Sequence, residues 1–241
     1  MEFRPKLTLL VRLGTLALLF TSIATQAQTT FSDGNFPDAN WSASKIFDST
    51  PGASASFSAF QTPTGGNPNA FRETQHAYAG PGGLDVGHLQ TSAFFRPSLQ
   101  GAIQTIDGSY DALVLSVGSS AAVGYGLALK QDGSYYLKAG AAVFPGTGWT
   151  SRIFSGLTSA DFGRVDDATF HPNFSPAGGD IQFGYYTANG TAFSAPESSD
   201  SGIDNWAVTV NAASTPEPGS AMLLLTLSAG SAGFVLRRQR R

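Results

Sequence analysis

Apolar and polar residues alternate over short stretches through much of this chain, as in β-strands that bury one side. Such stretches occur at 55–60, 88–95 and 101–106. A nearly continuous apolar run at 111–118 predicts a strand buried on both faces, and only 157–162 suggests a helical turn. Many short strands without a long amphipathic helix predict an all-β protein, a β-sandwich of two packed sheets.

Two turn signals predict hairpins. Residues 123–139 give the clearer one, because two stretches rich in β-forming residues enclose Asp132 and Gly133. An Asp-Gly pair tolerates the positive φ angles of a type I′ turn. A second hairpin is predicted at Asn189 and Gly190, between two further β-rich stretches.

The composition indicates a folded domain with a hydrophobic core. The chain contains 18 Phe, 7 Tyr and 3 Trp, which is too many for a disordered segment. A closing strand is predicted at 203–210, with Trp206, Val208 and Val210 on one face. The absence of cysteine excludes disulfides and every cysteine-based zinc or iron–sulfur site. Stability must therefore come from the core.

The N-terminal segment has the pattern of a secretory signal peptide. Basic residues at Arg4, Lys6 and Arg12 precede or interrupt an apolar stretch at 13–23, and small residues lead up to Ala27. We predict cleavage after Ala27, so that the signal peptide is 1–27. A retained signal anchor is the alternative, which the shortness of the apolar stretch and the polar residues after it disfavour.

The final segment, 215–241, has three parts in a fixed order: a Pro-Glu-Pro signal, an apolar run and an arginine cluster. The run at 221–236 is slightly short for a bilayer core of roughly 30 Å, but its flanks extend it to a marginal transmembrane helix. Arginines after such a run stay on the cytoplasmic side and leave the upstream chain outside. A buried C-terminal helix is the alternative, although four arginines are hard to bury. The signal residues are Pro216, Glu217, Pro218, Arg237, Arg238, Arg240 and Arg241.

This tail resembles the PEP-CTERM sorting segment of exported bacterial proteins. The resemblance covers only 215–241 and implies processing by an exosortase-type enzyme. It also implies a transient anchor in the inner membrane, followed by a place at the cell surface or outside the cell. The same kind of tail is sometimes catalogued with ice-binding proteins, but no regular Thr-x-Thr array for a flat ice-binding face occurs in this sequence.

Four phrases stand out between the two ends, over the predicted ectodomain 28–214. They are FSDGNF at 31–36, GGNPNAFR at 65–72, HPNFS at 171–175 and GIDNWAV at 202–208. Together they resemble the jelly-roll ectodomains, similar to laminin-G-like and concanavalin-like sandwiches, that precede many PEP-CTERM tails. The resemblance implies that the first and last strands lie side by side, with a structural calcium ion at their ends.

The charge of the ectodomain limits the classes of partner that it can bind. Residues 28–214 contain seven Lys or Arg and fifteen Asp or Glu, a formal charge of −8. We predict no nucleic-acid partner, because phosphates require a basic surface. Acidic side chains suit solubility or Ca²⁺, whose ligands are oxygens. The alternative is that Asp33 begins a turn and Asp204 caps the start of a strand. The candidate calcium ligands are Asp33, Asn35, Asp38, Asp204 and Asn205.

Catalytic motifs are missing from the sequence. It has no His-Glu-x-x-His, Gly-x-Ser-x-Gly or Walker loop. Ser42 and Lys45 match Ser-x-x-Lys without its partner motifs, and Glu73 and Glu197 lie too far apart to form a strand pair of glycosidase carboxylates. The three histidines share no metal-ligand spacing. We therefore predict that the protein is not an enzyme.

Several polar residues are candidates for binding sugar hydroxyls. Asn67, Asn69 and Arg72 lie in a glycine-rich loop, and His171 and Asn173 lie in the HPNFS phrase. Turns are the favoured interpretation of both segments, and a binding site is the alternative. The three tryptophans, at 41, 149 and 206, either stack on sugars or belong to the core.

These features predict an exported surface or matrix protein that associates with extracellular polysaccharide as a non-catalytic binding module. A purely structural matrix protein is the first alternative and a glycan-active enzyme the second. Polar residues around an exposed Trp on a concave sheet would favour binding, a featureless sheet would favour a structural role, and a carboxylate pair in a cleft would favour an enzyme.

Overall fold

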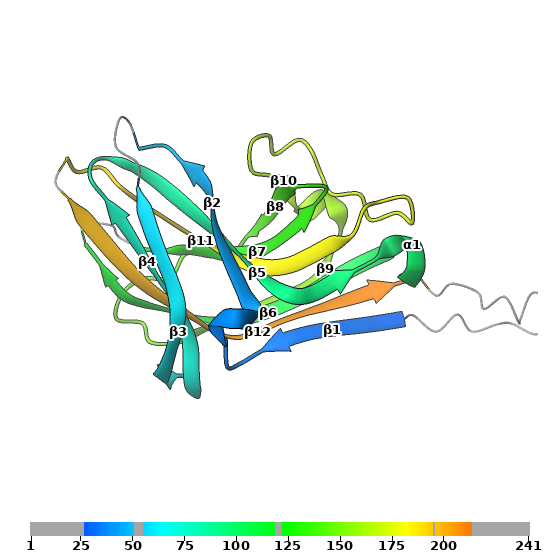
Figure 1. Ribbon diagram of the computed structural model, residues 1–241, viewed down its shortest axis with the longest axis horizontal. Helices are drawn as coiled ribbons and strands as arrows, with labels where there is room; N and C mark the ends of the chain where they lie inside the picture. The colour runs from blue at the N-terminus through cyan, green and yellow to red at the C-terminus, as the bar shows by residue number, and fades with distance from the viewer. Residues whose placement is uncertain (1–26, 51–54, 119–121, 195, 214–241) are drawn as a thin grey trace, which may run out of the picture.

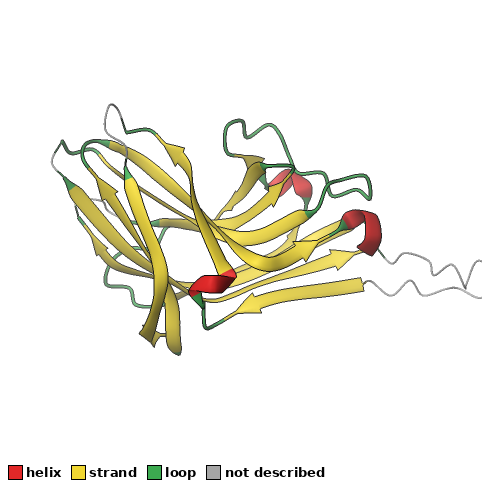
Figure 2. Cartoon of the chain, viewed as in Figure 1, coloured by secondary structure: helices red, strands yellow, loops and turns green. Residues whose placement is uncertain are grey.

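Two antiparallel sheets face each other in the computed structural model, which describes residues 27–50, 55–118, 122–194 and 196–213 (Figures 1 and 2). The all-β prediction and the two-sheet sandwich are confirmed. The apolar segments predicted as signal peptide and transmembrane helix lie outside the described residues. Inside those ranges, no helix is long and apolar enough to cross a membrane.

The first sheet, sheet A, has the strand order β3-β4-β12-β6-β9, and β1 also pairs with β12. Strands β4 and β1 share one edge of β12, β4 along 197–203 and β1 along 206–212. The strand bounds are β1 (Ala27–Asp33), β3 (Ser56–Gly66), β4 (Asn69–Tyr78), β6 (Ile103–Val117), β9 (Thr150–Leu157) and β12 (Glu197–Ala212).

The second sheet, sheet B, has the order β10-β8-β7-β11-β5-β2. Its strands are β2 (Trp41–Asp48), β5 (Gly82–Phe95), β7 (Gly124–Gln131), β8 (Ser134–Ala139), β10 (Gly163–Arg164) and β11 (Ile181–Thr191). Helical structure among the described residues is limited to three short turns: η1 (Asp38–Asn40), α1 (Pro97–Gln100) and η2 (Ser159–Asp161). The helical turn predicted at 157–162 is therefore present as η2, with a Thr158–Asp161 capping box.

The core fills the space between the sheets. Trp206, Val208 and Val210 are buried on the same side of β12, as their spacing predicts. Trp206 packs edge-on against Trp41 with ring centroids 5.1 Å apart, and its Nε1 donates a hydrogen bond to the Gly184 carbonyl of the opposite sheet at 3.2 Å. A buried indole needs such a partner. This contact ties the two sheets together.

The predicted hairpin at 132–133 is confirmed. Gln131 pairs with Ser134, and the two residues between them, Asp132 and Gly133, have φ angles of 51° and 84°. Positive φ at both central positions is the requirement of a type I′ turn. The turn joins β7 to β8.

The second predicted hairpin is wrong. Strand β11 continues through Asn189 and Gly190, which pair with Leu84 and Gly83 of β5. The turn preference of Asn-Gly is overridden by pairing with β5, whose backbone supplies partners for β11 from Ile181 to Thr191.

The predicted strands at 101–106 and 111–118 also need correction, because they belong to one strand, β6. That strand is not buried on both faces, since Leu115 is 45% exposed. It alternates, with one side in the core and the other on the outer surface of sheet A.

The first and last strands lie side by side, as the resemblance implied. Ala27 of β1 is opposite Ala212 of β12, and the hydroxyls of Thr30 and Thr209 are 2.9 Å apart across the pair. Figure 1 shows that both ends of the domain therefore leave from the same edge.

Candidate functional site

The outer face of sheet B carries two adjoining hollows. The larger has a volume of about 540 Å³, and the smaller, of about 290 Å³, shares Arg164 and Val165 with it. In Figure 1, β2 stands on one side of this face, and β8 and β10 stand on the other. We call the two hollows together the groove. Its main residues are Lys45, Ile46, Phe47, Asp85, Tyr135, Leu137, Lys138, Asp161, Arg164, Val165, His171 and Tyr186.

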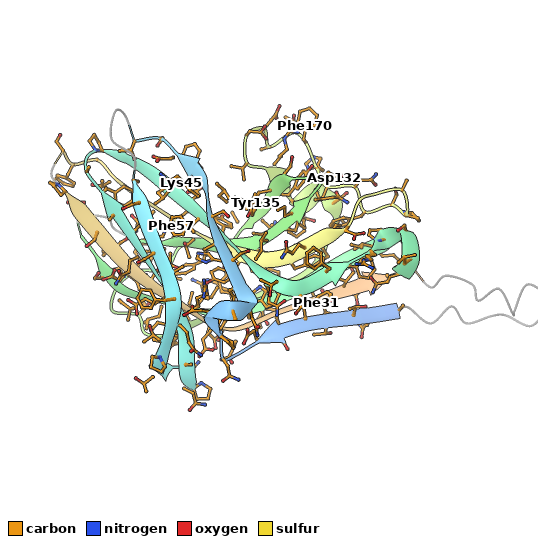
Figure 3. The ribbon with its side chains drawn as sticks, in the orientation of Figure 1. Phe31, Lys45, Phe57, Asp132, Tyr135 and Phe170 are labelled. Atoms are coloured by element: carbon orange, nitrogen blue, oxygen red, sulfur yellow. The ribbon has the colours of Figure 1, made fainter. Side chains whose placement is uncertain are left out.

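Glycines in the floor make room for aromatic rings. A Cβ atom on Gly87 would lie 2.8 Å from a ring carbon of Tyr135, and one on Gly126 would collide with the ring of Tyr186. Because side chains alternate along β11, Tyr186 lies on the groove side, where it is 8% exposed, while Tyr185 lies in the core. Figure 3 shows Tyr135 and, on β2, Lys45 at the space between the two sides.

Each basic side chain that lines the groove, other than His171, has an acidic partner. Lys45 pairs with Asp48 at 2.7 Å, and Lys138 pairs with Asp161 at 3.3 Å. The third pair joins Arg164 to Asp166 at 2.5 Å. These ion pairs restrain the long side chains of Lys45, Lys138 and Arg164, whose nitrogen atoms lie along the sides of the groove.

An exposed aromatic ring also lies at Arg164. The guanidinium of Arg164 lies over the ring of Phe170, 4.3 Å from its centroid. Phe170 follows β10 in the chain and is exposed on the loop labelled in Figure 3. The planar guanidinium is thus fixed by a carboxylate and by a ring, which orients it.

Asp85 is the acidic residue of the groove floor. It lies on β5, opposite Phe47 of β2 and Ala188 of β11. Burial raises the pKa of its carboxyl group to about 6, and its charge adds to the rise that burial causes in the pKa of Tyr186, to about 12. Among the described residues, no hydrogen bond or ion pair engages the Asp85 carboxylate.

Asp161 is the other acidic residue of the larger hollow. Unlike Asp85, it is held by hydrogen bonds and an ion pair. The backbone N–H of Thr158 donates to its carboxylate at 2.9 Å, the Thr158 hydroxyl lies at 3.1 Å, and Lys138 binds the second oxygen. These contacts, led by the backbone hydrogen bond, lower the pKa of Asp161. Its carboxylate is therefore committed to the η2 cap.

His171 is the one sequence-predicted binding residue that the structure brings to the groove. Its Nδ1 lies 2.8 Å from the carbonyl oxygen of Phe162. A carbonyl only accepts, so Nδ1 carries the proton and the ring orientation is fixed.

The other predicted binding residues lie elsewhere. Arg72 is only 3% exposed and pairs with Asp38 at 3.0 Å. Asn67 lies in the β3–β4 turn, where its amide donates to Asp111 at 3.1 Å, and Asn69 follows it at φ 71°. Asn173 is exposed in the loop before β11, where its N–H donates to Gln131.

The candidate calcium ligands are distributed over three local networks. Asp33 accepts hydrogen bonds from the N–H groups of Asn35 and Phe36 and from Trp41 Nε1, each at 2.8 Å. This is the turn weighed as the alternative. Asp38 is engaged by the Arg72 guanidinium, as described above.

Asp204 and Asn205 lie at the irregularity of β12 between its two edge partners. The Asp204 carboxylate accepts from the N–H groups of Asn67 and Asn205, and Asn205 Nδ2 donates to Asp111 at 2.8 Å. No group of three or more His, Cys, Asp or Glu placed to hold a metal occurs in the described ranges. The calcium site stays a prediction.

The aromatic residues of the groove were missed by sequence reasoning, which considered tryptophans. Trp41 and Trp206 belong to the core, and the half-buried Trp149 packs edge-on against Phe71 and donates to the Gly65 carbonyl. The groove instead uses Tyr135 and Tyr186. No local pattern marks them, because the ring and the glycine beneath it come from different strands.

Comparison with known proteins identifies the tail. Residues 214–241 match the PEP-CTERM protein-sorting motif. The tail resemblance is confirmed, and the motif implies export and a C-terminus anchored in the membrane before processing. The search of curated proteins found no match to this chain.

Solved structures with a similar fold include carbohydrate-binding modules. A family 11 module from Clostridium thermocellum, in complex with a β-1,3-1,4-mixed-linked tetrasaccharide, is 12% identical, covers 76% of this chain and 96% of its own, and has a TM-score of 0.42. A family 22 module of Xyn10B from the same organism is 11% identical. It covers 77% of this chain and 96% of its own, with a TM-score of 0.41. Identity at this level does not transfer a ligand to this chain.

Proposed function

We propose that the groove on the outer face of sheet B binds a polysaccharide chain outside the inner membrane. The protein would be an exosortase-processed, non-catalytic module associated with surface or extracellular exopolysaccharide. The observation that carries this proposal is the combination in one solvent-open groove of the aromatic rings of Tyr135, Tyr186 and Phe47 with ordered polar side chains.

This combination suits a sugar chain. Each sugar ring has apolar C–H faces, which pack on aromatic side chains, and hydroxyl groups, which need hydrogen-bond partners. Phe47 is 44% exposed, although burying such a ring would be favourable. The ion-paired sides of the groove offer donors at Lys138 and Arg164, and Asp85 offers an acceptor. A few placed polar groups among aromatic residues are typical of binding sites.

Binding is favoured over hydrolysis by the state of the three carboxylates that line the groove. A glycosidase needs one carboxyl group as an acid and a second as a nucleophile or base. Asp85 has the raised pKa of an acid, but both oxygens of Asp161 are held by Thr158 and Lys138. Asp166 is paired with Arg164, so Asp85 is the one carboxylate of the groove without an ion-pair partner among the described residues.

The position of the domain relative to the tail supports a role at a surface. Strand β12 ends at Ala212, only a few residues before the Pro-Glu-Pro signal, and β1 begins beside it. The groove lies on sheet B, whereas both chain ends leave from sheet A. A tethered domain can thus hold a polymer while its tail is bound.

A glycan array tests the proposal. The full-length protein, purified in detergent, is screened against bacterial and plant polysaccharides and their oligosaccharides, with each hit assayed for release of reducing ends. Binding without release supports the proposal. Absence of binding across the array would favour the structural matrix alternative, and release of reducing ends would favour an enzyme.

A further inference from the structure

Asp85 is the unmatched charge of the groove. Lys45, Lys138 and Arg164 each have a carboxylate partner within 3.3 Å. Within the described part of the chain, Asp85 has no such partner, although it lines the same hollow as Lys138 and Arg164. After the pairs cancel, a negative charge remains on the floor.

The field of the whole domain has the same sign. Residues 28–214 carry a formal charge of −8, so a positively charged polymer is attracted before it reaches the groove. Inside the groove, a cation next to a half-buried carboxylate interacts more strongly than it would in water. Phe47, which lies opposite Asp85 and is exposed, supplies the ring surface on which the sugar carrying that cation would rest.

We propose that the groove selects polysaccharides whose sugars carry free, protonated amino groups, and that Asp85 is the residue that recognises this positive charge. The selectivity rests on the proposed function, because it assigns a ligand class to the same groove. An ammonium group on the sugar would donate hydrogen bonds to the Asp85 carboxylate and complete the charge pairing of the groove.

Other classes of glycan fit the charges less well. A polymer of uronic acids would have to compete with Asp161 and Asp166 for Lys138 and Arg164, and it would meet the negative field of the domain. A neutral glycan would gain hydrogen bonds but would leave Asp85 without a counter-charge. Asp85 is half-buried, so its charge is poorly solvated, and burial raises its pKa to about 6.

Three matched ligands test the selectivity: β-1,4-linked hexasaccharides of glucosamine, N-acetylglucosamine and glucose. They differ only in the group at C2, which is an ammonium, an acetamide or a hydroxyl. Titration calorimetry at pH 6.5 with the full-length protein in detergent should give at least about tenfold tighter binding of the glucosamine oligomer. Raising the salt concentration should reduce that preference.

Asp85→Asn is the decisive variant. It keeps the size of the side chain and should reduce the preference for glucosamine to about twofold or less. Asp132→Asn is the matched control, since it removes the same charge at the exposed hairpin turn, where Asn also tolerates φ 51°. The control should keep the preference of the parent.

The pH dependence provides a second readout. Lowering the pH from 6.5 to 5 should weaken glucosamine binding in the parent protein as Asp85 takes up a proton, and should have less effect in Asp85→Asn. The comparison with the variant is needed because other ionisable groups line the groove. These are Lys45, Tyr135, Lys138, Asp161, Arg164, Asp166, His171 and Tyr186. Tyr78 also interacts electrostatically with Asp85, and the amino groups of the ligand gain protons as the pH falls.

The outcomes separate the two proposals. Equal binding of the three oligomers, or a preference that survives in Asp85→Asn, overturns the selectivity and leaves glycan binding intact. If the protein binds only neutral or acidic glycans on the array, the selectivity is likewise overturned and glycan binding remains. Absence of binding to every glycan on the array overturns both proposals.

Discussion

The imidazole of His88 is stacked on the ring of Tyr185 in the core, with centroids 4.4 Å apart and planes within 9°. His88 lies on β5 and Tyr185 on β11, so the contact joins neighbouring strands of sheet B. The hydroxyl of Thr187 lies 3.3 Å from Nε2 of His76 in sheet A and 3.5 Å from Nε2 of His88. Two buried histidines thus meet at one threonine between the sheets.

This histidine pair should make the domain sensitive to acid. Burial lowers the pKa of His76 from 6.5 to about 4 and that of His88 well below its ordinary value. The unfolded chain therefore binds protons below pH 6.5 that the folded domain excludes. The stability is fully present above pH 6.5 and falls as the pH decreases, by about 1.4 kcal/mol per pH unit for each excluded proton.

Thermal melts between pH 7.5 and 4.5 check this prediction. His76→Gln should give a shallower loss of melting temperature with acid than the parent protein, even if it melts lower at pH 7.5. Asp85 acts in the opposite direction, because burial raises its pKa, so only the difference between variant and parent is informative. Parallel pH curves for the two proteins would exclude His76 as a source of acid sensitivity.

The β7–β8 turn should depend on Gly133. A Cβ atom added there meets no atom within 4 Å, so a substitution acts only through the backbone, whose φ is 84°. Gly133→Val should destabilise the domain by roughly 1–2 kcal/mol, because a β-branched residue resists positive φ. Gly133→Asn should cost less, since Asn tolerates this region. Denaturant unfolding measures the stability of both variants. Equal stability of Gly133→Val and the parent protein would contradict the assignment of a type I′ turn.

Calcium should stabilise the domain if the predicted site exists. The structure places Asp204 and Asn205 at the irregularity of β12, with Asp111 and Asn67 as neighbours, and Asp33 in an adjoining turn. Added calcium should then raise the melting temperature relative to chelator, and Asp204→Ala should abolish the rise. Identical melting in calcium and in chelator would assign these carboxylates to the hydrogen-bond networks alone.

The PEP-CTERM tail should be removed from the exported protein. Intact mass should show a product that begins near Gln28 and has lost Arg241. Replacing the four terminal arginines with Ser should weaken membrane retention before processing, because these charges set the orientation of the tail. A secreted product that retains Arg241 would rule out processing at this motif.

Local patterns predicted the parts of the fold that local geometry decides. Asp132 and Gly133 form the expected turn because their φ preferences are intrinsic, and Trp206 and Val208 share a face because side chains alternate along a strand. Asn189 misled the prediction, since the pairing of β11 with β5 overrides the local turn signal.

The groove was beyond sequence reasoning because it depends on residues far apart in the chain. Tyr135 rests beside Gly87 of another strand. Arg72 is buried and pairs with Asp38 of η1, which precedes it by more than one strand. His171, a candidate sugar-binding residue of the HPNFS phrase, does line the groove. The sequence contains the chemistry, but the pairing of strands decides which side chains face solvent together.

The central claim, that the groove binds a glycan, is tested most directly by replacing two of its aromatic rings, the half-buried Tyr135 and the exposed Phe47. Tyr135→Ala and Phe47→Ala should each weaken binding of the best glycan from the array by about tenfold, or ~1.4 kcal/mol. The control, Ile153→Ala, removes a side chain that is 79% exposed on sheet A and should leave the Kd unchanged. Loss of affinity in the two groove variants alone is the predicted result. Unchanged affinity in both, or an equal loss in the control, would contradict the assignment of the groove.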